Sequence, residues 1–195
     1  MRNVHVREMG VPIHLVRPWI EASWTGTPRD PFPRDVLETW RKNPPDVDPL
    51  ALIPNVTRIG HGTFSFRFES WNGERWRVRV ESQHFQGWHG FDLQSTPIGC
   101  RVTHTIELAP SAKGRVLWRV LIAPIHDWCV EAMLDRMEEA VRTGEMPTVT
   151  RRKMPWPAAV SFAFLSRVTR ARSALMGSRR GEGPRAELSR RLSLK

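Results

Sequence analysis

The residue whose position most suggests chemistry is His104, because it stands in an otherwise apolar row. The segment 100–108, CRVTHTIEL, alternates apolar and polar residues apart from this histidine. Alternate side chains of a strand point to opposite faces of the sheet, so His104 is predicted to share a face with Val102 and Ile106. A buried imidazole there could orient a ligand carbonyl or hydroxyl, or move a proton. The simpler interpretation, which we favour on sequence alone, is a core histidine hydrogen-bonded to backbone or water.

Other residues offer weaker chemistry. His126 and Asp127 are neighbours in a predicted helix, where adjacent side chains point about 100° apart. Asp127 is therefore better explained as a first-turn acid that favours the helix dipole than as a partner in a dyad. His84 and His89 flank a glycine-containing segment and could edge a cavity mouth, although loop histidines are common. Because no GxSxG, P-loop, HExxH or paired CxxC motif occurs, we predict no metal and no cofactor.

A series of alternating segments would position these residues. Strands are predicted over 3–9, 62–70, 75–82, 91–95, 100–108 and 115–122, with Asn72-Gly73 as a hairpin turn between the second and third. In the last segment the apolar row is Val116, Trp118, Val120 and Ile122. Each strand is apolar on one side and mostly polar on the other. This pattern indicates one antiparallel sheet with one face in solvent and one face covered.

A long helix is predicted to supply the cover. Residues 124–144 lack an internal breaker, and Pro124 and Gly144 mark the two ends. Apolar residues recur at helical spacing, namely Ile125, Cys129, Ala132, Met133, Met137, Ala140 and Val141. Ahead of the sheet, short helices are predicted over 12–24, where Pro18 should break or kink the first, and over 30–42. The proline-rich segment 43–55 is predicted to be a loop.

Length and composition favour one domain over 1–147 with an extension over 148–195. The chain has 195 residues, of which 40% are hydrophobic, and this suffices for a core. Its two cysteines, Cys100 and Cys129, have no metal-ligand or redox spacing and are predicted to be small buried residues in a reducing cytoplasm. We find no signal-peptide pattern and no apolar run long enough to span a membrane, so a cytoplasmic location is expected.

The excess charge lies entirely in the extension. Residues 148–195 hold twelve basic and two acidic residues, which account for the whole net charge of +10. A helix is predicted over 158–176, with Val160, Phe164, Val168, Ala171 and Leu175 on one side, and the remainder is predicted to be disordered. A basic amphipathic helix suits an anionic membrane surface, which would make the protein peripheral at the inner face of the membrane. The alternatives are a helix docked on its own domain and an arginine-rich linker. Nucleic-acid binding is not expected, because the sequence lacks the folded basic groove with interleaved aromatic residues of a dedicated binder.

The order of elements resembles a known superfamily. The segments FSFRFES, GERWRVRVES, TPIGCRVTHTIEL and GRVLWRVLIAPIHDWCVEAMLDRMEEAVRTG are similar to the START-like helix-grip (SRPBCC) proteins, which include polyketide cyclase/dehydrase and lipid-transport types. The resemblance covers roughly residues 3–144. It implies an α+β fold in which a curved antiparallel sheet of about seven strands wraps a long helix. It also implies an internal cavity for a hydrophobic small molecule or lipid.

The resemblance implies that the inward residues line a ligand cavity. From the sequence alone, the same residues could equally fill a solid core. The predicted lining residues are Phe66, Phe68, Trp76, Val78, Phe91, Val102, His104, Trp118, Val120, Cys129, Met133 and Met137. Our leading hypothesis is a protein that binds or carries a hydrophobic molecule. The alternative is a cyclase/dehydrase-like enzyme with His104 as polar anchor or acid/base. A lone histidine in the cavity would favour binding, whereas two or three directed polar groups would favour chemistry.

Overall fold

A six-stranded antiparallel sheet forms the body of the protein. The computed structural model describes residues 1–23, 30–33, 58–61, 64–147 and 152–180. The sheet has the order β1-β6-β5-β4-β3-β2. Its strands are β1 (Arg2–Met9), β2 (Arg58–His61), β3 (Phe64–Trp71), β4 (Arg75–Glu81), β5 (Phe85–Thr96) and β6 (Gly99–Pro110). Five strands are long and β2 has four residues, so the described residues form six strands rather than about seven.

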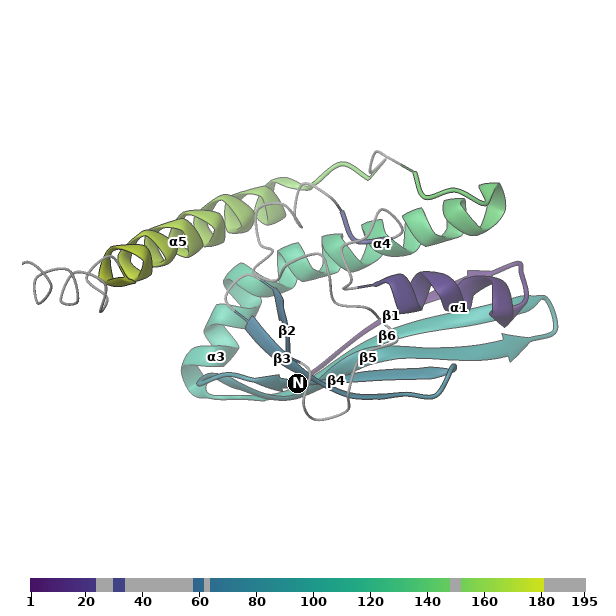
Figure 1. The fold of residues 1–195 in the computed structure, drawn as a ribbon, viewed down its shortest axis with the longest axis horizontal. Helices are drawn as coiled ribbons and strands as arrows, with labels where there is room; N and C mark the ends of the chain where they lie inside the picture. Colours follow the sequence, from purple (N-terminus) through teal and green to yellow (C-terminus); the bar gives the residue numbers. More distant parts are fainter. Residues whose placement is uncertain (24–29, 34–57, 62–63, 148–151, 181–195) are drawn as a thin grey trace, which may run out of the picture.

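The helices lie on one face of this sheet (Figure 1). Helix α1 (Ile13–Ala22) contains Pro18, and most of the second predicted helix and all of the loop predicted over 43–55 lie outside the described residues. A continuous helical run follows β6, made of α3 (Ala112–Leu117), the π-helical turn η2 (Trp118–Ile122) and α4 (Ala123–Thr143). Helix α4 crosses the sheet and ends at Gly144, whose φ of 81° is left-handed, as the sequence predicted.

The strand predicted over 115–122 is wrong, because these residues are helical. Ser111 caps the run by accepting a hydrogen bond from the Gly114 backbone N–H at 3.1 Å. In a helix, residues four apart share a face, so the predicted apolar row divides into two pairs. Trp118 and Ile122 are buried against the sheet, whereas Val116 and Val120 are more than 60% exposed.

Charged side chains connect strand β1 to helix α4. Arg7 donates to Glu131, Asp135 and Glu138 of α4 at distances between 2.9 and 3.0 Å. His5, on the same face of β1, has its Nδ1 2.8 Å from Glu131 Oε1. The outward residues Val4 and Val6 are exposed instead. The edge of the sheet therefore holds the long helix by ion pairs, while the centre holds it by apolar packing.

Helix α5 (Trp156–Arg180) is longer than the helix predicted over 158–176 and continues through Gly177. Its inner side includes small residues: Ala158 and Ser161 are buried, and Ser161 donates to the Val120 carbonyl at 3.4 Å. Its outward residues include Trp156 and Phe164, which are 78% and 51% exposed. The helix is thus docked on α4 and η2, and Figure 1 places it on the side of α4 away from the sheet.

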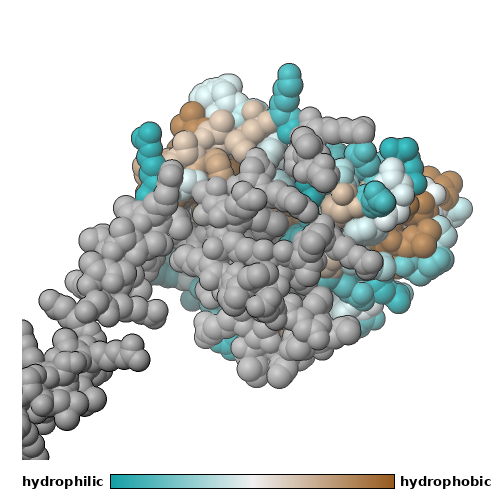
Figure 2. Space-filling model, turned by 45° about the horizontal axis from the view of Figure 1, so that its top comes forward, coloured by the Kyte–Doolittle hydropathy of each residue, from teal (hydrophilic) through white to brown (hydrophobic). Residues whose placement is uncertain are grey.

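The described surface carries further apolar residues. Figure 2 shows hydrophobic residues gathered towards both ends of the visible face, with hydrophilic residues between them. Among the described residues, no helix combines the length and the apolarity that crossing a membrane requires. Both cysteines are buried, as expected from the sequence.

Candidate ligand cavity and histidine cluster

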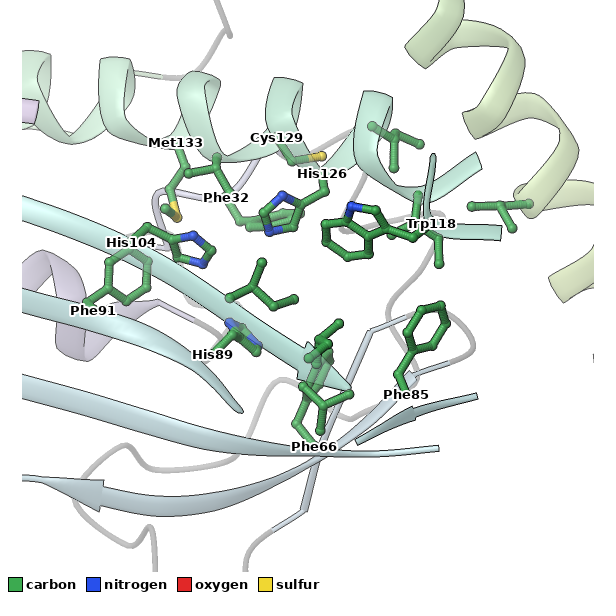
Figure 3. Close-up of a pocket in the computed structure, with 17 residues that line it drawn as sticks. Phe32, Phe66, Phe85, His89, Phe91, His104, Trp118, His126, Cys129 and Met133 are labelled. Carbon is green, nitrogen blue, oxygen red and sulfur yellow. The ribbon is translucent and has the colours of Figure 1, made fainter. Parts of the chain in front are cut away.

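A cavity of about 90 Å³ lies between the sheet and the helical run. Strands β3 to β6 form its floor, and η2 and α4 form its roof (Figure 3). Phe32, which precedes the sheet strands β2 to β6, and Leu165 of α5 also line the cavity. The described lining residues are Phe32, Phe66, Val80, Phe85, His89, Phe91, His104, Ile106, Leu108, Trp118, Ile122, Ile125, His126, Cys129, Val130, Met133 and Leu165. The wall is therefore aromatic and aliphatic, apart from three imidazoles.

The predicted lining residues fall into three groups. Six of them line the cavity: Phe66, Phe91, His104, Trp118, Cys129 and Met133. Five are buried in the surrounding core, where they support the wall: Phe68, Trp76, Val78, Val102 and Met137. Val120 points into solvent, because the segment that carries it is a helix rather than a strand. Contact of any of these residues with a ligand remains a prediction.

His104 occupies the predicted inward position on β6. It is 2% exposed, and its Nδ1 is buried without a hydrogen-bond partner among the described residues. Its ring packs edge-on against Phe91, the directly opposed residue on β5, with 4.9 Å between ring centroids. The sequence predicted a hydrogen bond from backbone or water to His104. Among the described residues, no protein atom makes such a bond to Nδ1.

Two other imidazoles join His104 at the cavity wall (Figure 3). His89, on β5, has its ring centroid 5.6 Å from that of His104, and His126, on α4, lies 5.3 Å away. His5 of β1 completes this histidine cluster, with its ring 5.8 Å from that of His126. His84, in contrast, lies in the turn between β4 and β5 and is not among the lining residues.

Burial sets the protonation of the two central imidazoles. Removal from water lowers the pKa of His104 well below its usual value, and the neighbouring His126, His89, His5 and Arg77 lower it further. Burial also lowers the pKa of His126, and the adjacent Asp127 only partly opposes this effect. At neutral pH both rings are therefore neutral, so each has one nitrogen that accepts and one that donates a hydrogen bond.

The pKa shifts of the two outer members, His5 and Asp127, favour their charged forms instead. Burial alone would lower the pKa of His5, but its contacts with Asp127 and Glu131 outweigh burial and raise it. Burial likewise would raise the pKa of Asp127, yet His126 and His5 hold it well below its usual range. Asp127 is not a first-turn acid, since the helical run begins at Ala112. The prediction that Asp127 favours the helix dipole is therefore wrong. Its carboxylate instead contacts His5, His126 and Asn3.

Part of this cluster could have been found from the sequence. His89 has the same parity as Phe85, Phe91 and Leu93, so the alternation that placed His104 inside also applies to it. The interpretation of this segment as a loop hid that signal, because β5 passes through Gly87 and Gly90 as a regular strand. The meeting of His5 with α4 has no local signal, as it joins residues 126 positions apart.

Comparisons with known proteins concern the fold. No family model and no curated protein matches the chain. A solved structure from Mesorhizobium loti is 14% identical with a TM-score of 0.46 and covers 73% of this chain and 98% of its own. One from Nitrosomonas europaea is 17% identical with a TM-score of 0.45, covering 74% and 96%. A Polyketide_cyc-like protein from Corynebacterium glutamicum is 13% identical with a TM-score of 0.33, covering 84% and 90%.

The architecture itself defines the class. It is an α+β fold in which an antiparallel sheet, with β1 beside β6, carries the long helix α4 across one face, as the sequence predicted. A fold alone specifies neither a ligand nor a reaction, so both have to be argued from the site.

Proposed function

We propose that the protein binds a small, mainly apolar molecule that carries one hydrogen-bonding group. The observation that supports this is the cavity, in which neutral imidazoles of His104 and His126 interrupt an otherwise hydrophobic wall. Ligand sites typically combine an apolar lining with a few polar groups that fix orientation. The unpartnered Nδ1 of His104 would gain a partner when such a ligand binds.

The size of the cavity favours a compact ligand over an extended lipid. Its volume of about 90 Å³ is smaller than the engineered cavity of about 150 Å³ that admits benzene. A single ring therefore requires a modest rearrangement of the wall. Met133 lines the cavity and has a flexible side chain that can make this room.

Matched one-ring probes test the proposal. Phenol and toluene have similar shapes, but only phenol can hydrogen-bond to an imidazole. A hydrogen bond contributes about 1 kcal/mol, so the protein should bind phenol about fivefold more tightly than toluene, after correction for their transfer from water. In His104→Phe the ratio of the affinities for phenol and toluene should fall towards one, while toluene still binds. Failure of both probes to bind, or an unchanged preference in His104→Phe, would refute the proposal.

Native mass spectrometry of the purified full chain offers an independent test. A co-purifying small apolar compound, identified after extraction, would give the natural ligand directly. A compound that remains bound to a variant with a filled cavity, such as Cys129→Phe, would contradict its placement there. Cys129 is suited to this change because its side chain lines the cavity from α4.

The histidine cluster favours a second candidate, a cyclase/dehydrase-like enzyme. His89 and His126 line the cavity beside His104 and meet the condition of two or three polar groups, and neutral histidines are suited to proton transfer. A minimal test is deuterium exchange at the methyl group of acetophenone, followed by NMR in heavy water. Exchange that is faster than in buffer and absent from His104→Phe would support catalysis. Exchange equal to that in buffer would leave binding as the function.

We also propose that α5 brings the protein to an anionic membrane surface. Trp156, Val160, Phe164 and Val168 are exposed on a helix from a strongly basic segment. Apolar insertion combined with basic residues is how interfacial helices bind, with about 1 kcal/mol for each basic residue near the surface. The docking of the opposite side of α5 on α4 is compatible with this, because it leaves the apolar residues outside.

A further inference from the structure

A group of polar side chains gathers where β1 faces α4, beside the cavity. His5, His126 and Asp127 each offer one nitrogen or oxygen atom, and these three atoms lie within 4.8 Å of one another. His5 Nε2 is 3.4 Å from Asp127 Oδ1, and His126 Nδ1 is 3.3 Å from the same oxygen. These side chains come from two elements at opposite ends of the domain sequence, so no ligand spacing is visible in the sequence.

We propose that His5, His126 and Asp127 bind one divalent transition-metal ion of the zinc class. Zinc lies about 2.0–2.1 Å from nitrogen and oxygen ligands, so the ligand atoms of a tetrahedral site are about 3.3 Å apart. The two separations that involve Asp127 already have this length. Two imidazoles and one carboxylate leave a fourth position open, which is typical of catalytic zinc sites and not of structural ones.

The surroundings of His5 prepare it for this role. Its Nδ1 is 2.8 Å from Glu131 Oε1, so the proton of the neutral ring belongs on Nδ1 and the lone pair on Nε2. That Nε2 is buried and has no hydrogen-bond partner among the described residues. A carboxylate that holds the far nitrogen of a metal-binding histidine is a common outer ligand. Asn3 holds the other proposed ligand, because its side-chain amide donates a hydrogen bond to Asp127 Oδ1 at 3.0 Å.

The competing arrangement is a charged His5 held between two carboxylates without a metal. An imidazolium would then donate from Nε2 to Asp127, but 3.4 Å is long compared with the about 2.7–2.9 Å of charge-assisted hydrogen bonds. The hydrogen bond to Glu131 therefore satisfies Nδ1 of His5, and the proposed metal ion would satisfy Nε2. The charges agree, because the two carboxylates would face a doubly charged cation.

The site adjoins the cavity through His126, which also lines it (Figure 3). In that view the imidazoles of His104 and His126 point towards each other. The metal site goes beyond the proposed binding of an apolar molecule, and it stands whether or not the cavity holds one.

Metal titration of the full chain tests the inference. The protein is treated with a chelator, dialysed, and titrated with Zn²⁺ against a chromophoric zinc dye, and separately with Co²⁺ to record its visible spectrum. We expect one equivalent of Zn²⁺ per chain and the intense Co²⁺ bands of a four-coordinate site. His5→Gln, His126→Gln and Asp127→Asn should abolish both signals. Glu131→Gln should weaken affinity by about 10- to 100-fold while keeping the stoichiometry.

His14→Gln provides the matched control, because His14 is an exposed histidine on α1. This variant should bind Zn²⁺ as the wild type does. Thermal melting guards against loss of fold: Zn²⁺ should raise the Tm of the wild type and leave the Tm of folded Asp127→Asn unchanged. Wild-type protein that binds no stoichiometric Zn²⁺, or His5→Gln and Asp127→Asn that bind it as tightly as wild type, would overturn the proposal.

Discussion

Replacing His104 by phenylalanine should make the protein less sensitive to acid. The imidazole is 2% exposed, and burial is the main reason why its pKa is low. His126 of α4, His89 of β5, His5 of β1 and Arg77 of β4 all disfavour the imidazolium further. The folded protein therefore keeps His104 neutral in a pH range in which the unfolded chain protonates it.

The sign and the size of the effect follow from this difference. The unfolded pKa is about 6.5, so stability is fully present above that pH and is lost as the pH falls below it. At about pH 5.5, one unit below the unfolded pKa, the loss approaches RT ln 11, or about 1.4 kcal/mol. A phenyl ring of similar shape takes no proton. His104→Phe should therefore shrink the difference in free energy of unfolding between about pH 7.5 and pH 5.5 by about 1.4 kcal/mol.

Urea denaturation of both proteins at the two pH values measures this change. His126 contributes to the pH dependence of the free energy of unfolding in both proteins, so its contribution cancels in the comparison. His14→Phe is the control, since His14 is exposed on α1 and its replacement should leave the pH dependence as in the wild type. If His104→Phe loses as much stability on acidification as the wild type, the reasoning from burial is refuted.

Three further changes test other parts of the structure. In Gly90→Ala the new Cβ would overlap the Trp76 carbonyl oxygen on β4, so we expect a loss of about 2–3 kcal/mol in urea denaturation, whereas Gly10→Ala, with nothing within 4 Å, should stay within about 0.5 kcal/mol. Arg7→Met removes the cation shared by three carboxylates of α4 and should cost about 1–2 kcal/mol at low salt and less at high salt; an equal loss at both would argue against an electrostatic role. Phe164→Ser should weaken co-sedimentation with phosphatidylglycerol vesicles about tenfold, and undiminished pelleting would remove the membrane proposal.

The hairpin of β3 and β4 was predictable because its signals are local. Gly73 adopts a φ of 86°, which favours glycine, and the Asn72 side chain accepts from the backbone N–H groups of Glu74 and Arg75. Alternation on either side then fixes which residues face the core. Turn chemistry and strand pattern agree here, so residues close in sequence specify the structure.

The segment 115–122 shows where the same reasoning fails. Four apolar residues spaced by two satisfy a strand, but residues four apart also share a face of a helix. The decisive signal was Ser111, which caps the helix, whereas Pro124, which the sequence indicated as a helix start, lies inside the continuous helical run. A short apolar segment next to a long helix is therefore ambiguous when its spacing alone is considered.

The candidate site was predictable strand by strand but not as a cluster. Parity places His104 and His89 on the inner face. Bringing His5 and His126 together requires the position of α4 over β1, and this depends on long-range ion pairs that no local pattern encodes. The docked side of α5 was missed for a different reason. Its fully buried residues include Ala158 and Ser161, which are small and carry little hydrophobic signal.

The widened turn η2 gives the protein a simple means of changing its pocket during evolution. In this turn the Ala123 N–H donates to the Trp118 carbonyl, five residues back, so it contains one residue more than a regular α-helical turn would. Deleting a single residue here would leave a regular α-helical turn, so the turn would lose one side chain while Trp118 keeps its direction over the cavity. The ion pairs between α4 and β1 would be untouched. Ligand preference could therefore change by one-residue deletions, without loss of the contacts that anchor the roof.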